Sequence, residues 1–113
     1  MRVNGNDIYL ITGDTGFLTL KIKENDSYID FQIDDKIYFT VKASTSTNIK
    51  TLQKIFEVNQ TSNEITIELH PNDTKDLPAR SFVYDIQYVK ASGEVYTVVP
   101  PSNFILIRGV TDE

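Results

Sequence analysis

The sequence contains no cysteine and a single histidine, His70. Without cysteine there is no disulfide, no thiol nucleophile, no iron–sulfur cluster and no thiolate-bound zinc. One histidine supplies only one of the several ligands that zinc needs, and the polar position of His70 in its segment predicts a surface residue. No Gly-x-Ser-x-Gly elbow is present to support a serine triad. We therefore expect no catalytic residues and no metal site.

Phosphate-binding loops, basic runs and long apolar runs are also missing. Neither of the glycine-rich phosphate-binding patterns occurs, so we expect no nucleotide cofactor and no small-molecule substrate. Eleven basic residues against sixteen acidic ones give a net charge of −5. This charge argues against a nucleic-acid partner, because phosphate neutralisation supplies most of that affinity. No apolar run could cross a bilayer or serve as a signal peptide. The simplest location is the cytoplasm.

The chain does contain enough apolar material for one small core. Of its 113 residues, 40% are hydrophobic and 11% are aromatic. A chain of this length has room for one domain, so residues 1–113 are expected to fold as a single unit.

Alternation of apolar and polar residues is the dominant pattern. Period-two alternation is typical of strands with one buried face. It is clearest in residues 18–22, 37–41, 65–69 and 82–88. Turn residues separate such segments, and seven or eight short strands can be counted. The pattern predicts an all-β fold, namely an immunoglobulin-like antiparallel β-sandwich of seven to eight short strands, with a small barrel as the alternative.

Three segments allow a more specific interpretation. Residues 49–58 fit either a short amphipathic helix or a strand, and we favour a strand from Lys54 onward because the neighbouring segments are strands. Residues 72–74 could cap a short turn before Leu77. The two prolines Pro100 and Pro101 should end a strand, because proline cannot donate to a ladder.

Two features suggest binding. Residues 24–35 contain five acidic side chains, and calcium prefers oxygen ligands, but the spacing does not match an EF-hand and apolar residues interleave with the acids. The chain has six tyrosines, and Tyr38 lies on the outward parity of its strand, as a carbohydrate-binding platform would require. A carbohydrate- or cell-surface-binding β-sandwich, with or without calcium, is therefore the alternative function.

The last apolar run, residues 104–107, is apolar on both strand faces. Phe104 and Leu106 share one face, and Ile105 and Ile107 share the other. Because a sandwich strand normally turns one face to water, the second face needs a cover. The cover is either the similar run at residues 8–11 or a partner subunit. The residues predicted for a partner interface are Phe104, Ile105, Leu106, Ile107, Ile8 and Leu10.

The second half of the chain carries a recognisable series of motifs. It runs from Asp-Thr-Lys-Asp-Leu-Pro at 73–78, through Phe-Val-Tyr-Asp-Ile-Gln-Tyr at 82–88, to Ser-Gly-Glu-Val-Tyr at 92–96 and Gly-Val-Thr at 109–111. With residues 13–15 and 35–42, this series resembles the small prophage-encoded β-sandwich proteins of Gram-positive bacteria. These proteins are similar to the N-terminal domain of the siphophage upper baseplate protein.

The resemblance implies a non-enzymatic phage structural or assembly protein. Its partners would be other tail or baseplate proteins and, in a homo-oligomer, further copies of the chain. Its location would be the host cytoplasm during assembly and then the virion. One position departs from common sandwiches: Phe82 stands where a tyrosine corner would place its hydroxyl, so either Tyr84 takes that role or the corner is absent.

Overall fold

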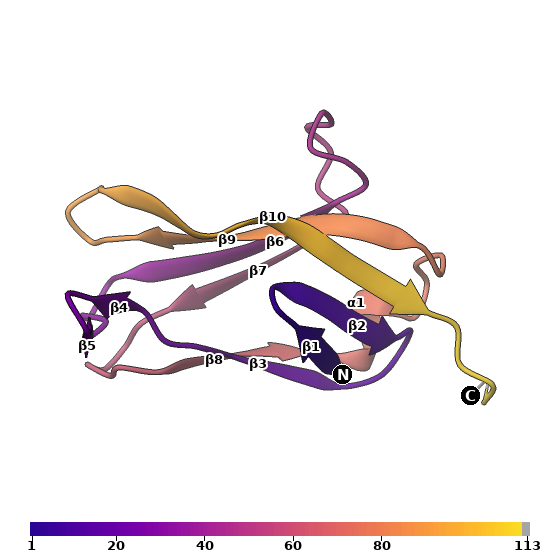
Figure 1. Ribbon diagram of the computed structural model, residues 1–113, viewed down its shortest axis with the longest axis horizontal. Helices are drawn as coiled ribbons and strands as arrows, with labels where there is room; N and C mark the ends of the chain where they lie inside the picture. Colours follow the sequence, from indigo (N-terminus) through magenta and orange to yellow (C-terminus); the bar gives the residue numbers. More distant parts are fainter. Residues whose placement is uncertain (112–113) are drawn as a thin grey trace.

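The computed structural model describes residues 1–111, which form ten strands and one helical turn (Figure 1). The elements are β1 (Arg2–Asn4), β2 (Asp7–Ile11), β3 (Gly16–Leu20), β4 (Lys23–Glu24), β5 (Ser27–Tyr28), β6 (Lys36–Lys42), β7 (Leu52–Glu57), β8 (Ile65–Leu69), α1 (Pro71–Thr74), β9 (Ser81–Val89) and β10 (Val95–Ile107). The predicted all-β class is confirmed.

Six strands form the main sheet, in the order β1-β2-β10-β9-β6-β7. Most neighbours are antiparallel, as predicted. The pair β2–β10 is parallel instead, with Phe104 opposite Ile8 and Ile107 opposite Ile11. This pair brings the two apolar runs of the sequence side by side, although about 100 residues of chain separate them.

A smaller layer covers one face of the main sheet. Strands β3 and β8 pair antiparallel, with Leu18 opposite Ile67, and lie across that face (Figure 1). Strands β4 and β5 form a hairpin at one end. The core fills the space between the layers, and its fully buried members include Ile8, Leu10, Phe31, Ile37, Phe39, Val41, Ile86 and Phe104.

Alternation explains why the core residues point inward. In β6, the side chains of Ile37, Phe39 and Val41 are 0% exposed, and each polar neighbour between them is partly exposed. Strand β8 shows the same pattern, with Ile65, Ile67 and Leu69 buried. Residues two apart on a strand share a face, so these segments bury one face between the layers.

The number of strands and the end of one strand differ from the prediction. The described residues hold ten strands rather than seven or eight, because β1, β4 and β5 are short pieces that alternation does not reveal. The prediction that Pro100 and Pro101 end a strand is wrong, since β10 continues through both. Its register with β9 shifts between Val99 and Ser102, so neither proline has to donate in the ladder.

The two ambiguous segments are resolved. Residues 52–57 form strand β7 paired with β6, so the helical alternative is wrong and the strand begins two residues before Lys54. The predicted capped turn is the helical turn α1. The Asp73 carboxylate accepts hydrogen bonds from the His70 backbone N–H at 2.7 Å and from Lys54 Nζ at 2.9 Å.

Two neighbouring residues of β8 test the register. Replacing Ile67 with alanine should destabilise the protein by about 2–5 kcal/mol, because Ile67 is 4% exposed and its loss leaves a cavity. Replacing Thr66, which faces solvent on the same strand, should cost less than about 1 kcal/mol. Urea denaturation measures both values, and equal losses at the two positions would contradict this register.

Candidate functional site

Four of the six predicted interface residues belong to the core. Ile8, Leu10, Phe104 and Leu106 are between 0% and 2% exposed and lie between the two layers. No partner can reach them in the folded chain, so the predicted interface must be corrected to exclude them. Their burial follows from the parallel pair β2–β10, which turns both apolar runs to the core with the same parity.

The other face of the same two strands is also apolar. Ile105 lies beside Tyr9, and Ile107 beside Ile11. We call these four side chains the outer strip. Ile11 is 43% exposed and Ile107 is 46% exposed. The run at residues 8–11 therefore does not cover the outward face of residues 104–107 but widens it. At one end, the Arg2 guanidinium lies 4.3 Å from the centre of the Tyr9 ring.

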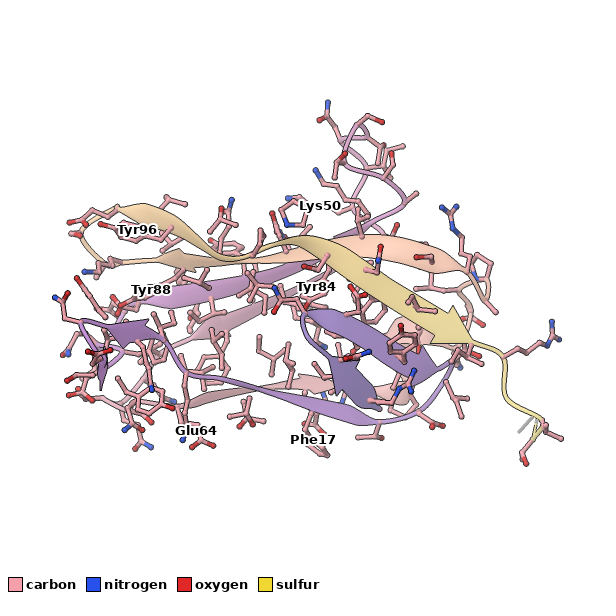
Figure 2. All side chains as sticks on the ribbon, viewed as in Figure 1. Phe17, Lys50, Glu64, Tyr84, Tyr88 and Tyr96 are labelled. Carbon is pink, nitrogen blue, oxygen red and sulfur yellow. The ribbon has the colours of Figure 1, made fainter. Side chains whose placement is uncertain are left out.

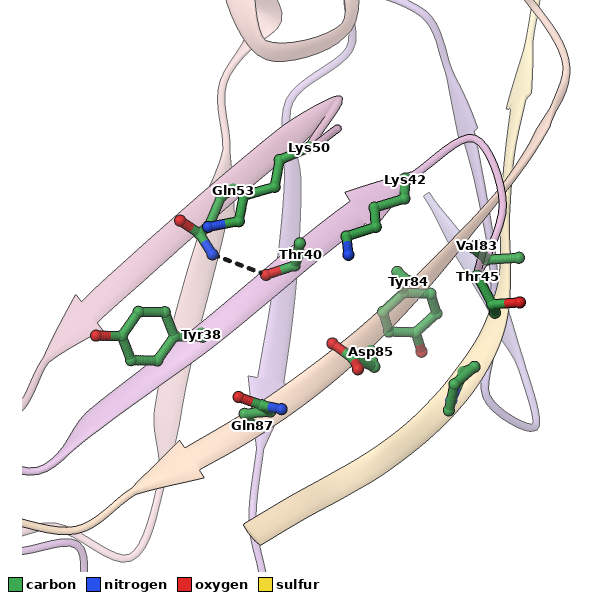
Figure 3. A pocket seen from close by; sticks show the side chains of 11 residues that line it. Tyr38, Thr40, Lys42, Thr45, Lys50, Gln53, Val83, Tyr84, Asp85 and Gln87 are labelled. Atoms are coloured by element: carbon green, nitrogen blue, oxygen red, sulfur yellow. Dashed lines mark hydrogen bonds between the residues drawn. The ribbon is translucent and has the colours of Figure 1, made fainter. Parts of the chain in front are cut away.

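A groove of about 400 Å³ lies on the outward face of the main sheet, over β6, β7 and β9. Figure 3 shows its floor, where Thr40 lies between Gln53 and Asp85 and accepts a hydrogen bond from Gln53 Nε2 at 3.0 Å. Tyr38 and Lys42 flank Thr40 along β6. The β6–β7 loop rises from this face (Figure 1) and contributes Thr45 and Lys50.

A second cavity, of about 660 Å³, opens at the end of the molecule where the β4–β5 and β9–β10 hairpins meet. Tyr88 and Tyr96 lie at this end (Figure 2). Asp35 lines the cavity and is 3% exposed. Its carboxylate accepts hydrogen bonds from the Tyr88 hydroxyl at 2.6 Å and from the backbone N–H groups of Gln32 and Ala91, each at 2.9 Å. These bonds tie the turn that contains Gln32 and Asp35 to the end of β9 and the turn that follows it.

The environment of Asp35 shifts two ionisation equilibria. Burial by itself would raise the pKa of Asp35, but the hydrogen bonds from Tyr88, Gln32 and Ala91 outweigh burial and hold that pKa below its ordinary value. Burial and the bond to the Asp35 carboxylate both raise the pKa of Tyr88. At neutral pH the pair is therefore a carboxylate that accepts a bond from a neutral phenol.

Tyr84 links the inner strand β9 to the β1 edge of the main sheet. Its hydroxyl donates to the backbone carbonyl of Asn6, in the turn between β1 and β2. Burial and the nearby Asp7 raise the pKa of Tyr84 to about 12. A tyrosine corner would bond to the loop before its own strand, so Tyr84 makes a different link, and Phe82 at the corner position is buried.

The predicted acidic and histidine candidates lie apart. Among residues 24–35, Asp35 is buried and hydrogen-bonded, whereas Glu24, Asp26, Asp30 and Asp34 are exposed. His70 is exposed and precedes α1, with its Nδ1 3.8 Å from a Glu68 carboxylate oxygen. Within residues 1–111, no three His, Cys, Asp or Glu side chains lie close enough together to hold a metal ion.

Comparisons of the chain with protein-family models, with curated protein sequences and with solved structures find no match. In addition, no helix in the described part of the chain is long and apolar enough to cross a bilayer.

Sequence reasoning found part of these surfaces. Alternation alone shows the outward parity of Tyr38 and places Ile105 and Ile107 on the face opposite Phe104, but it does not show which of those two faces is outward. Gln53, Asp85 and Gln87 were missed as groove residues, although each lies on the polar parity of its strand. The missing signal was strand order, because only the pairing of β6 with both β7 and β9 brings these side chains together.

Proposed function

We propose that this chain is a non-enzymatic structural or assembly module of the phage tail or baseplate type. Its fold would be a variant of the immunoglobulin-like β-sandwich. It binds another virion subunit through the outer strip, or a further copy of itself within a homo-oligomer. It would be made in the host cytoplasm and then carried in the virion. The resemblance of roughly residues 8–111 to prophage-encoded proteins supports the class.

The outer strip is the observation that carries the proposal. An outward sheet face is normally polar, yet Tyr9, Ile11, Ile105 and Ile107 form a continuous apolar surface on two adjacent strands. Aromatic and aliphatic side chains grouped in this way are typical of the centre of an interface, whereas singly scattered apolar residues are not. The Arg2 side chain stacked on Tyr9 fits an interface rim, where arginine is also common.

The strip is tested by placing charges on its two central isoleucines. The double variant Ile105→Lys/Ile107→Lys should leave the melting temperature within a few degrees of the wild type, because both side chains face outward. It should abolish co-purification with a phage tail or baseplate protein, or self-association measured by light scattering, because a buried lysine without a partner is costly at an interface.

Two further variants make the test specific. Phe104→Lys/Leu106→Lys places the same charges in the core and should unfold the protein. Phe17→Lys changes an apolar side chain that is 59% exposed on the smaller layer (Figure 2) and does not belong to the strip, so it should leave binding intact. The proposal is wrong if the wild type remains monomeric and binds no tail protein, or if the strip variant binds as the wild type does.

A further inference from the structure

The groove over β6, β7 and β9 shares no residue with the outer strip and has a different chemistry. Strand register arranges the outward side chains in and beside the groove in rows that run across the strands. Ile55, Tyr38 and Gln87 form one row, and Gln53, Thr40 and Asp85 form the next. Neighbouring strands lie about 4.8 Å apart and successive rows about 7 Å apart. The rows thus present a regular grid of side chains to a ligand that lies across the sheet.

The floor offers both hydrogen-bond donors and acceptors. The amides of Gln53 and Gln87 each provide two donor hydrogens and an acceptor oxygen, and the Asp85 carboxylate accepts only. One donor of Gln53 is used on Thr40 at 3.0 Å, and this bond fixes the orientation of the amide. All these side chains are partly exposed. Such a mixed set suits a ligand with many hydroxyl groups, because each hydroxyl both donates and accepts.

Tyr38 lines the groove, and the side chain next to it on β7, just outside the groove, is apolar. The Tyr38 ring is partly exposed and stands beside Ile55, which is 51% exposed on β7. A tyrosine offers a flat apolar face and a polar tip in one side chain. The C–H face of a pyranose ring packs on such a surface while its hydroxyls reach the neighbouring row.

The charge of the groove differs from that of the chain. Lys42 and Lys50 line it against the single carboxylate of Asp85, although the whole chain carries a net charge of −5. Neither lysine forms an ion pair with a residue in the range 1–111. A cationic region on an acidic protein favours an anionic ligand, because its charge is attracted locally and the lysines contribute charge-assisted hydrogen bonds.

We propose that this groove binds an acidic saccharide. A sugar ring packs on Tyr38, hydroxyls bond to Gln53, Asp85 and Gln87, and the acidic group of the ligand lies toward Lys42 and Lys50. The proposal goes beyond the assembly role, because it concerns another surface and another class of ligand.

A glycan array tests the ligand class. The array carries glycans with uronic acid, sialic acid or phosphate groups beside neutral glycans of matched length. We expect retention on acidic glycans, with binding that weakens as sodium chloride rises from about 0.05 M to about 0.5 M. The uronic, sialic and phosphate arms identify the source of the acidic group. The proposal fails if no acidic glycan binds, or if neutral glycans bind equally well.

Matched variants then test the place of binding. Lys50→Glu should lower the affinity for the best glycan about tenfold or more, because a charge-assisted bond is replaced by repulsion. Lys75→Glu makes the same change of net charge at another exposed lysine and should have little effect. Tyr38→Ala should also weaken binding about tenfold, and Tyr28→Ala, at a tyrosine 48% exposed elsewhere, should not.

Unchanged melting temperatures separate lost binding from lost folding in these four variants. Equal effects of Lys50→Glu and Lys75→Glu would show that the whole-molecule charge, and not the groove, attracts the glycan. Equal effects of Tyr38→Ala and Tyr28→Ala would likewise remove the groove from the binding site. Either result overturns the proposal.

Discussion

Replacing Phe39 with alanine should lower the free energy of unfolding by about 3–5 kcal/mol. Phe39 is 0% exposed in the middle of β6, and β6 pairs with strands on both sides. Its ring centre lies 5.3 Å from that of Tyr84 and 5.9 Å from that of Phe104, so the three rings form one packed cluster. Alanine removes the central ring and leaves a cavity that three strands would have to collapse to fill.

Urea denaturation measures this effect, and Thr40→Ala is the matched control. Thr40 is the next residue on β6 and faces outward, so its loss should cost about 1 kcal/mol or less. Small domains have a total stability of about 5–15 kcal/mol, so a loss of this size at Phe39 removes a large part of the total when the stability lies at the lower end of that range. A loss below about 1 kcal/mol at Phe39 would contradict its central place in the core.

The pattern of buried and outward residues in β6 shows what alternation can predict. Period two assigns each residue to a face, and it correctly separated Phe39 from Tyr38 and Phe104 from Ile105. Alternation carries no information about which strands are neighbours. The parallel pair β2–β10 joins residues about 100 positions apart, and no local signal in either run indicates its partner or its direction.

Local signals also misjudged the prolines and the shortest strands. Proline excludes a ladder donor, but β10 avoids the conflict by a shift of register at Pro100 and Pro101, which depends on how β9 lies beside it. Strands of two residues, such as β4 and β5, are too short to show any period.

The residues of the groove show the same limit, because alternation does not indicate which strands are neighbours. Tyr38 could be recognised as outward, but the groove needs Gln53 from β7 and Asp85 from β9, and their proximity follows from strand order. Asp35 is the clearest failure of composition-based reasoning. In the sequence it belongs to an acidic turn beside Asp34, yet it is buried because Tyr88, 53 residues further on, donates to it.

This burial leads to the second large effect. Asp35→Ala should destabilise the protein by about 3–5 kcal/mol, because it removes one acceptor from three donors. The Tyr88 hydroxyl is the most affected, since Tyr88 is 3% exposed and its donor would be left without a partner. Tyr88→Phe removes the same bond without stranding a donor and should cost less. In the double variant, the two losses should not add, because both remove the same contact.

The stability conferred by Asp35 should also depend on pH. Its pKa in the folded protein lies below the ordinary value of 3.8, so the folded state favours the carboxylate. This contribution is therefore fully present above about pH 5 and is lost as the pH falls through the folded pKa. The stability gap between the wild type and Asp35→Ala should accordingly narrow below about pH 4. Asp73, which forms an ion pair with a lysine, is present in both proteins. Burial would raise the pKa of Asp73, but its hydrogen bonds lower it, so the stability of each protein keeps some dependence on acid. Urea denaturation at a series of pH values measures the gap, and a gap that stays constant down to pH values of about 2 would show that Asp35 is not held as a carboxylate by Tyr88.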